Sequence, residues 1–377
     1  MLQAPPSEGN GMNRLPVTVC IPTYNGARYL DDCLKSVRAQ SFDEVEILVV
    51  DDQSSDETPS IVGKHAALDS RVRVEQNPRR LGLVGNWNRS VELARGEWIK
   101  FVFQDDLIDS LCVERLVEAG RRTGATMVAC TRRIVLEGAD DETRRIYRQY
   151  VEKESLTGVF PGKTEVSARE FSNAVLDHNK KNFVGEPTSV LLHRTAFQRF
   201  GKFNPNLVSM CDLEYWIRVG VHDGLSIVSE PLATFRVHAA GASARYRKDM
   251  RYRLEKLDSL ILLHEFAFNE SHAPLRAAAA DRDPPIRIKD LFAQQALVAR
   301  VATRKTDVPR DQKPRLKAEW RAVATEFPRI HRSLVVRRAR LLRILGWYRL
   351  RKLLTTLRSD SRGKKPEASE MPRSLSR

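Results

Sequence analysis

Carboxylate side chains stand in close pairs directly after short apolar runs, an arrangement that could hold a hard divalent cation. The pairs are Asp51 with Asp52, Asp105 with Asp106, and, further along the chain, Asp212 with Glu214. Mg²⁺ and Mn²⁺ take oxygen ligands, and Mg²⁺ commonly binds one or two carboxylates together with substrate phosphates. Acidic residues also follow strands in solvated loops, so one pair alone does not identify a site. The three pairs together could bind a nucleoside diphosphate through a bridging metal ion.

The glycine-rich signatures of other phosphate sites are absent from the sequence. No GxGxxG follows the first apolar run, and GxxxxGK[ST] occurs nowhere. Dehydrogenase and P-loop ATPase functions therefore lose their main sequence support. A diphosphate would have to be held by a metal instead of a glycine cradle.

The elements that position these carboxylates alternate between strand and helix. Short, wholly apolar runs predict strands over 17–21, 45–50, 72–75 and 98–103, and helical spacing predicts helices over 27–40, 57–68 and 86–95. This order predicts an α/β fold with a mixed, mainly parallel sheet that is flanked by helices on both faces. Ligands of open α/β sheets bind beyond the carboxyl ends of the strands, so the polar clusters at 22–25, 51–53 and 104–106 should share one edge.

The rest of the chain is read more coarsely. Residues 138–182 are polar and irregular, and we interpret them as an insertion that forms either part of an acceptor site or a simple surface excursion. A strand is expected over 188–193, a helix opens at 212, and 225–235 reads as a strand pair or a strand-turn-strand. The predicted organisation is a loose arm at 1–14, a catalytic domain at 15–245, a helical basic region at 246–358 and a disordered tail at 359–377.

Composition bounds the class of protein. The 377 residues carry a formal charge of +15, and this charge is uneven, because residues 1–245 sum to −2 and residues 246–377 to +17. Five scattered cysteines without a CxxC pair argue against a zinc site or a disulfide framework. No apolar run approaches the roughly 20 residues of a membrane span. We expect a reduced, cytoplasmic protein.

Several stretches together resemble the family 2 glycosyltransferases of GT-A fold, which transfer sugars from nucleotide-sugar donors. They read VTVCIPTYNGARYLDDCLKSVRAQ, EILVVDDQSSDET, NPRRLGLVGNWNRSVELARGEWIKFVFQDD, MCDLEYWIRV and FRVH. The resemblance is specific over roughly 15–130 and weaker over 185–240, and it ends near 250. It implies an inverting transfer from a UDP-sugar, or another nucleotide sugar, to a hydroxyl of a glycan or lipid-linked acceptor.

The resemblance also implies roles for individual residues of the donor site. Those matched to the nucleoside and ribose contacts are Pro22, Thr23, Tyr24, Asp52, Asn88 and Asp105, and those matched to the divalent metal, Mn²⁺ or Mg²⁺, are Asp106 and His238. Asp52 would hydrogen-bond the base, which is usually uracil. Trp87 stands where an arginine is frequent, which leaves some phosphate or ribose contacts without their usual residue.

Asp212 matches the aspartate of the family's ED motif and is the implied general base. An inverting transfer needs a carboxylate to take the proton of the attacking hydroxyl, while a metal neutralises charge on the leaving diphosphate. Cys211 replaces the acid that usually precedes this aspartate, and Glu214 is the alternative base.

The C-terminal segment carries an independent prediction. Between Arg332 and Arg358 there are nine basic residues and no acidic ones, interleaved with leucines, Trp347 and Tyr348. This pattern is typical of a helix that lies on an anionic membrane surface, and 330–358 would then bring the protein to the inner face of the membrane. The alternative is a helix packed on the catalytic domain with a solvated basic face. No nucleic-acid motif accompanies the charge, so no nucleic-acid partner is expected.

Two other functions stay open at this point. A sugar nucleotidyltransferase shares the fold class but usually carries a glycine-rich basic loop after the first strand, and PTYNGARYL is not such a loop. A catalytically silent sugar-nucleotide binder is compatible with Cys211 beside the implied base. It would bind the donor without turnover.

Overall fold

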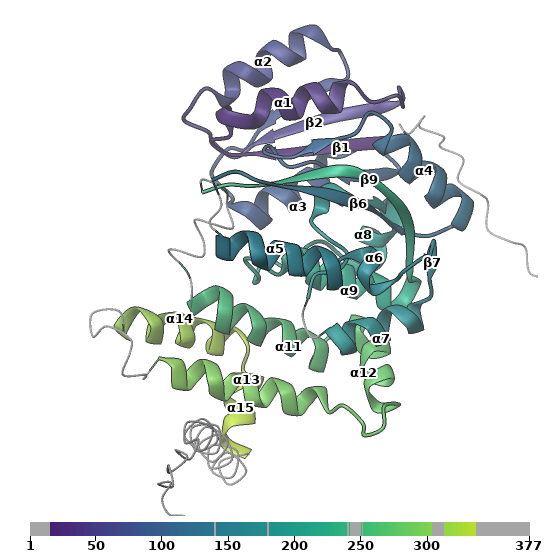
Figure 1. Ribbon diagram of the computed structural model, residues 1–377. Coiled ribbons are helices and arrows are strands. Elements are labelled where there is room, and N and C mark those ends of the chain that lie inside the picture. The colour runs from purple at the N-terminus through teal and green to yellow at the C-terminus, as the bar shows by residue number, and fades with distance from the viewer. Residues whose placement is uncertain are drawn as a thin grey trace, which may run out of the picture. The chain divides into compact units, whose positions relative to one another are not determined.

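The computed structural model describes residues 16–138, 141–178, 181–239, 241, 250, 252–303 and 313–336. Contacts divide the chain into two compact units, Met1–Ala299 and Arg300–Arg377. Every strand described belongs to the first unit (Figure 1). The predicted segments 1–14 and 359–377, and all but the start of 330–358, lie outside the described residues.

The first part of the fold alternates strand and helix as predicted. Its elements are β1 (Val17–Thr23), α1 (Ala27–Arg38), β2 (Val45–Asp51), α2 (Thr58–Leu68), β3 (Val72–Gln76), α3 (Leu83–Leu93) and β4 (Trp98–Phe101). β1 and β2 are buried at every position, as expected of parallel strands that are covered on both faces.

The second part of the first unit mixes short and long elements. They are β5 (Leu107–Ile108), α4 (Cys112–Thr123), β6 (Met127–Leu136), α5 (Asp141–Lys153), α6 (Leu156–Val159), β7 (Glu165–Val166), α7 (Ala168–His178), a 3-10 turn (Pro187–Ser189), β8 (Val190–His193), α8 (Arg194–Phe200), α9 (Cys211–Asp223) and β9 (Leu225–Val237). Helices follow: a π-helical turn (Arg253–Asp258), α11 (Ser259–Phe268), a 3-10 turn (Glu270–His272), α12 (Ala273–Ala280) and α13 (Ile288–Ala302), whose last residues belong to the second unit. The second unit contains α14 (Lys313–Glu326) and α15 (Arg329–Val336).

One nine-stranded sheet organises these elements. Its order is β3-β2-β1-β4-β8-β6-β9-β5, and β7 pairs with β9 beside this path. The strands β3, β2, β1 and β4 are mutually parallel, whereas β8 runs antiparallel to both β4 and β6. The predicted mixed, mainly parallel α/β sheet with flanking helices is confirmed.

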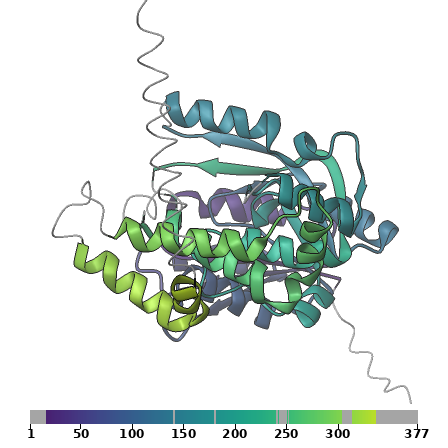
Figure 2. The ribbon, with the colours of Figure 1, turned by 90° about the horizontal axis from the view of Figure 1, so that it is seen from below.

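The two faces of the sheet are packed by different helices. One core joins alternate residues of β1 and β2 to the apolar faces of α1, α2 and α4, with Leu30, Leu34 and Leu116 fully buried. The opposite face of β1 and β2 is covered by α3, and α8 and α9 lie on that side farther along the sheet (Figures 1 and 2). The carboxyl ends of β1, β2 and β4 are thereby left at one common edge.

Two predictions about the middle of the chain are corrected. The segment 138–182 is not irregular, because α5, α6, β7 and α7 occupy most of it. In α7 the buried Phe171, Ala174 and Val175 stand at helical spacing, a short period that the predominantly polar composition of the segment outweighed in the prediction. Residues 225–235 are neither a strand pair nor a strand-turn-strand, because β9 continues through Pro231 as one strand. Pro231 lies at a shift in the register between β9 and β6, where a residue without an N–H is tolerated.

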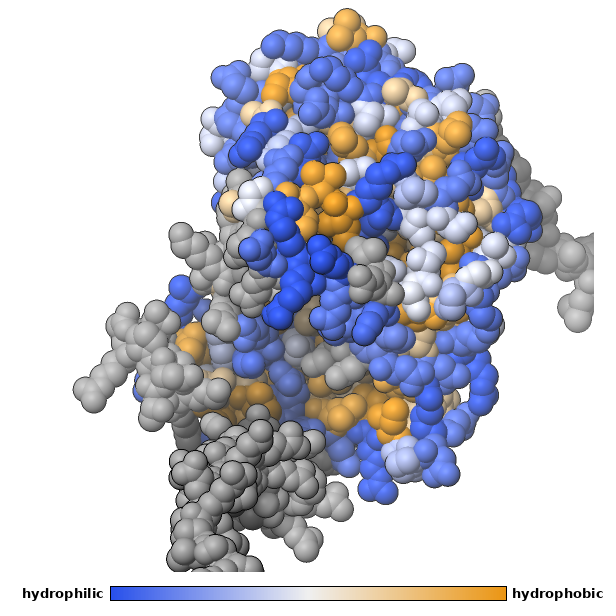
Figure 3. Space-filling view, viewed as in Figure 1, coloured by the Kyte–Doolittle hydropathy of each residue, from blue (hydrophilic) through white to orange (hydrophobic). Residues whose placement is uncertain are grey.

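The helical C-terminal region is confirmed for the residues that the structure describes, although the first compact unit extends past the predicted boundary at 245 as far as Ala299. The four-way domain division stays a prediction. No helix among the described residues combines the length and the apolarity that a bilayer span requires. The face in Figure 3 is mainly hydrophilic, with small hydrophobic patches between polar side chains.

Candidate active site

The loop after β1 is clasped by a side chain from the loop after β4. The backbone N–H of Tyr24 donates to Oε1 of Gln104 at 2.9 Å, and Nε2 of Gln104 donates back to the Tyr24 carbonyl at 3.2 Å. A Cβ on Gly26 would lie 2.3 Å from that Oε1, so any larger residue there would displace the Gln104 amide. The Tyr24 ring is partly exposed and carries the Arg80 guanidinium 3.9 Å above its centroid. Gln104 thus joins the loops that follow β1 and β4, and the Tyr24 ring lies beside this junction.

Pro22 and Thr23 are the last residues of β1 and are buried. The Thr23 hydroxyl lies 3.3 Å from Oδ1 of Asp51, the residue that ends β2. Asp51 also accepts from the backbone and hydroxyl of Ser54. These contacts fix the β1 and β2 ends against each other, and they leave Tyr24 as the more accessible part of the predicted nucleoside loop.

Asp52 is buried and organises the next loop. Its carboxylate accepts from Nδ2 of Asn77 at 2.8 Å and from the backbone N–H groups of Leu81 and Gly82 at 2.7 and 2.8 Å. Gly82 has a positive φ of 77° and directly precedes α3. An ionised carboxylate has about four acceptor positions, of which the protein uses three. Asp52 therefore shapes the loop 77–82, and one acceptor position remains for a ligand.

The predicted nucleotide residue Asn88 is engaged elsewhere. Its side chain pairs with both backbone groups of Phe203, donating to the carbonyl at 2.9 Å and accepting from the N–H at 3.0 Å. Asn86 instead faces the strand ends, where its Oδ1 accepts from Asn77 and its Nδ2 donates to the Val50 carbonyl. Among the described contacts, Asn86 joins the Asp52 cluster and Asn88 anchors the segment after α8.

The acidic pair after β4 divides into an exposed and a buried carboxylate. Asp105 keeps 24% of its side-chain surface exposed and lies 3.0 Å from Nε2 of His238. Asp106 is buried and accepts from the Thr188 hydroxyl at 2.6 Å and from the Arg236 backbone N–H at 3.0 Å. Burial, followed by the charge of Asp105, raises the pKa of Asp106 well above its usual range. Two acids and one imidazole thus meet at the ends of β4 and β9.

Aromatic and charged groups from α1 and β6 hold this acidic cluster. The His238 ring packs against Tyr29 with 4.5 Å between centroids, and the Arg236 guanidinium lies 4.6 Å from the same ring centroid. Arg236 donates to the Asp105 carbonyl at 3.1 Å and to Glu137 at 2.8 Å, and Glu137 also accepts from the Tyr29 hydroxyl. The position of Asp105 and His238 is therefore fixed from three directions.

Asp212 lies in the first turn of α9 and is partly exposed. One oxygen accepts from the Leu213 backbone N–H at 2.8 Å, and the other accepts from Nδ2 of Asn182 at 3.0 Å. Its burial in surrounding protein raises its pKa to about 7; the charge of Glu186 adds to this rise and Arg132 opposes it. A carboxylate with a pKa near 7 is matched to proton abstraction at neutral pH.

The alternative base, Glu214, faces a different environment. It is buried on α9 and pairs with Arg218 one turn later, with 3.0 Å between Nε and Oε1. Oε1 also lies 3.5 Å from Nε2 of buried His272. Glu214 therefore belongs to a structural ion-pair cluster between α9 and the 3-10 turn before α12, and Asp212 is the better candidate.

The segment 182–189 links the acidic cluster to the candidate base, and sequence reasoning missed it. Asn182 donates to Asp212, Thr188 donates to Asp106, and the charge of Glu186 raises the pKa of both aspartates. Its sequence, NFVGEPTS, contains no recognisable motif. These residues gain a role only because the fold places them beside the two aspartates. Gln104 and Arg236 were also missed, although each stands inside a stretch that carries the family resemblance.

The residues can be tested for their fit to a divalent metal. Nδ1 of His238 is buried without a hydrogen-bond partner in the described structure, and Asp105 on the other side of that ring is an accessible oxygen donor. No three His, Cys, Asp or Glu side chains converge as a complete metal site within the described ranges. The Asp105 carboxylate fits a cation that a substrate diphosphate helps to coordinate, which is the usual habit of Mg²⁺. Nδ1 of His238 lies on the opposite side of the ring from Asp105, and both Asp106 oxygens already accept hydrogen bonds from the protein.

Comparison with known proteins assigns the fold and the family. Residues 18–199 match the family model described as glycosyl transferase family 2. An uncharacterised Mycobacterium tuberculosis protein, MT1568, is 30% identical over 241 residues, which are 64% of this chain and 73% of that protein. A Campylobacter jejuni GalNAc(5)-diNAcBac-PP-undecaprenol beta-1,3-glucosyltransferase is 35% identical over 104 residues, or 27% of this chain and 33% of that enzyme.

Solved structures agree with this fold. The Staphylococcus aureus TarS 1–349 complex with UDP-GlcNAc is 18% identical, covers 83% of this chain and 73% of its own, and has a TM-score of 0.51. The Pyrobaculum calidifontis mannosyltransferase PcManGT complex with GDP-Man and Mn²⁺ is 17% identical, covers 86% and 87%, and also has a TM-score of 0.51. The fold is that of GT-A glycosyltransferases. The chain belongs to glycosyltransferase family 2 and is a glycosyltransferase.

Proposed function

We propose that the protein transfers a sugar with inversion from a UDP-sugar to a hydroxyl of a glycan or lipid-linked acceptor, with Asp212 as the general base. The observation that carries this proposal is the position of Asp212, which has a pKa raised to about 7 and is joined through the segment 182–189 to the acidic pair after β4. The UDP-GlcNAc complex of TarS and the undecaprenol-linked substrate in the name of the C. jejuni relative support the substrate classes.

The donor would lie along the edge formed by the β1, β2 and β4 ends. The exposed Tyr24 ring and the remaining acceptor position of Asp52 suit a nucleobase, which has a flat face and an N–H edge. The donor diphosphate would meet Asp105, Asp106 and His238 together with Mn²⁺ or Mg²⁺. A divalent cation there supplies charge neutralisation for the leaving nucleoside diphosphate. The Mn²⁺ in the PcManGT complex supports this choice of cofactor.

The chemical step needs one proton acceptor on the side away from the diphosphate. The acceptor hydroxyl oxygen forms a bond to the anomeric carbon of the donor, and the bond from that carbon to the diphosphate oxygen breaks. Asp212 takes the hydroxyl proton. Asn182 holds one Asp212 oxygen at 3.0 Å and the Leu213 N–H holds the other at 2.8 Å, so the carboxylate is oriented before the acceptor arrives.

Calorimetric binding of UDP and of GDP, each with and without Mn²⁺, tests the donor half of this proposal. We expect binding of UDP that depends on Mn²⁺ and is lost in Asp106→Asn. The matched control is Asp43→Asn, because the Asp43 side chain is 94% exposed and lies outside the site. A preference for GDP would overturn the UDP assignment. Binding without any turnover of UDP-sugars would favour a silent nucleotide-sugar binder.

A further inference from the structure

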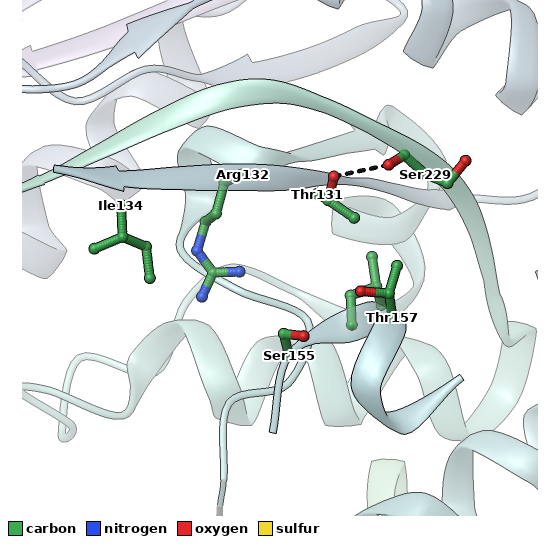
Figure 4. Close-up of a pocket in the computed structure, with 7 residues that line it drawn as sticks. Thr131, Arg132, Ile134, Ser155, Thr157 and Ser229 are labelled. Atoms are coloured by element: carbon green, nitrogen blue, oxygen red, sulfur yellow. Dashed lines mark hydrogen bonds between the residues drawn. The ribbon is translucent and has the colours of Figure 1, made fainter. Parts of the chain in front are cut away.

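A pocket of about 240 Å³ lies between β6, β9 and the region of α6. Four hydroxyl side chains contribute to its lining, those of Thr131, Ser155, Thr157 and Ser229, and two aliphatic side chains and one guanidinium complete it (Figure 4). The Thr131 hydroxyl donates to the Ser229 carbonyl at 2.9 Å, which ties the two strands together at the pocket wall. The pocket therefore has a wall of polar groups on a rigid scaffold.

Among the described residues of the lining, Arg132 is the one that carries a charge. Its side chain is 4% exposed, extends from β6 toward Ser155, and forms an ion pair with Glu186 (Figure 4). Gly185 packs so closely that a Cβ there would lie 2.5 Å from an Nη atom of this guanidinium, and its φ of 114° favours glycine. The backbone of the segment 182–189 thus fixes the position of Arg132.

The same segment connects the pocket to the candidate base. Nδ2 of Asn182 donates both to the Gly185 carbonyl, at 3.1 Å, and to Asp212, at 3.0 Å. The Trp216 indole N–H donates to the Gly185 carbonyl at 2.9 Å, which holds this turn against α9. Glu186 pairs with Arg132 on one side, and its charge reaches Asp212 on the other. The pocket and the base therefore share one short, well-anchored turn.

The lining suits a sugar ring. Hydroxyls and a guanidinium offer donors and acceptors at fixed positions, and aliphatic side chains suit the C–H faces of a pyranose. The volume lies below the roughly 300–1,000 Å³ of pockets for drug-sized ligands, which favours one ring. Since Glu186 already neutralises Arg132, the pocket gives no excess positive charge for a phosphate.

We propose that this pocket binds one neutral monosaccharide unit of the acceptor, and this assignment rests on the proposed glycosyl transfer. The ring would hydrogen-bond to Arg132 and to the hydroxyls of Ser155 and Thr157, and its neighbouring hydroxyl would extend toward Asp212. The pocket is thus a specificity site for the acceptor, separate from the donor edge at the ends of β1 and β2.

Ligand-observed saturation-transfer NMR tests the assignment directly. The probes are the methyl α- and β-glycosides of glucose, galactose, mannose and N-acetylglucosamine, with inorganic pyrophosphate as competitor. We expect at least one glycoside to give a saturation-transfer signal with the full chain. That signal should be about tenfold weaker with Thr157→Trp, because the indole would fill the pocket. Ser229→Trp is a second filling variant, and Thr164→Trp is the matched control on an exposed residue outside the lining.

The outcomes separate this proposal from the proposed function. The pocket assignment is overturned if no glycoside gives a signal, if both filling variants bind like the wild type, or if pyrophosphate displaces the glycoside. Binding of UDP and Mn²⁺ should be equal in the wild type and in Thr157→Trp. If that binding is absent in the wild type while a glycoside signal depends on Thr157, the pocket stands and the donor proposal fails. Thermal melting confirms that each filling variant is folded.

Discussion

The donor edge and the base side of the candidate site are built in different ways. At the donor edge, contacts run between loops that directly follow β1, β2, β3 and β4, and the Asp52 carboxylate already accepts three hydrogen bonds from Asn77, Leu81 and Gly82. At the base side, the pKa of Asp212 is raised to about 7, because desolvation by the surrounding protein outweighs the donors that reach the carboxylate. The first region is a preformed frame, and the second keeps a carboxyl group poised to exchange a proton.

This difference indicates which residues each half of the reaction uses. The donor edge would hold a nucleotide by its shape and by fixed hydrogen bonds. Nucleotide binding of this kind does not require a carboxyl group that titrates near neutral pH. Proton abstraction requires such a group, and perturbed pKa values concentrate where chemistry occurs. Substitutions on the two sides should therefore separate binding from turnover.

The largest expected effect follows from removing the proton acceptor. Asp212→Asn should lower the turnover number by about 10²- to 10⁴-fold, the usual contribution of a general base. The amide keeps the shape of the carboxylate, so the Kd for UDP with Mn²⁺ should stay at the wild-type value. Steady-state transfer and calorimetry on the same preparation check both statements. Turnover near the wild-type rate would remove Asp212 from the base role and return attention to Glu214, the alternative base.

Asn88 tests whether a residue predicted at the nucleotide is instead part of the scaffold. Asn88→Ala leaves the N–H and carbonyl of Phe203 without their partners, and we expect the free energy of unfolding to fall by about 1–3 kcal/mol. The Kd for UDP with Mn²⁺ should not change. Urea denaturation and calorimetry measure the two quantities. A large loss of UDP affinity with unchanged stability would restore the nucleotide role implied by the family resemblance.

The clasp between Gln104 and Tyr24 tests the preformed character of the donor edge. Gly26→Ala forces the Gln104 amide away from Tyr24 and breaks two hydrogen bonds, each worth about 0.5–1.5 kcal/mol. We expect UDP affinity to fall roughly tenfold. In the Gln104→Ala background the same change should cost little, because no amide remains to be displaced. Additive losses in the double variant would show that Gly26 acts independently of Gln104.

The frame of the site was more predictable from the sequence than its chemistry. Residues such as Val17 and Val49 lie in runs whose apolar character marks a strand without knowledge of any distant contact, and the polar letters after each run lie at the strand ends. The structure places the predicted site residues Thr23, Tyr24 and Asp105 at or just after these strand ends, because each follows its apolar run directly in the sequence. Local sequence contains enough information for a βαβ frame.

The rest depends on contacts between distant segments. Glu186 reaches Asp212 and Arg132 only through the fold, and nothing in its own neighbourhood distinguishes it from an acid in a surface loop. Asn88 lies in a helix with the expected spacing, yet its partner, Phe203, is 115 residues away. The helices within 138–182 were missed although Phe171, Ala174 and Val175 of α7 stand at helical spacing, because the apolar runs there are short and the segment is mostly polar. These roles depend on contacts between residues that are far apart in the sequence, and such contacts cannot be deduced from a single sequence.

The smallest predicted effect concerns the charge beside the base. Transfer needs ionised Asp212, so kcat/KM should rise with pH as the pH passes through about 7, the pKa of this carboxyl group in the free enzyme. Glu186 raises that pKa by repulsion, so Glu186→Gln should lower it and extend activity toward acid pH. The loss of the Glu186 charge beside Arg132 acts in the same direction, because the guanidinium charge, which already favours ionised Asp212, is then less compensated.

The ratio of kcat/KM at about pH 6 to that at about pH 8.5 should therefore rise roughly two- to tenfold in Glu186→Gln, since this limb of the profile changes tenfold per pH unit below the pKa. Glu165→Gln is the matched control, because Glu165 is exposed on β7 and pairs there with Arg122. An unchanged profile would mean that the acid limb belongs to another group. A shift toward higher pH would mean that Glu186 supports the charged base instead of opposing it, and the contrast between a preformed donor edge and a poised base side would then fail at Asp212.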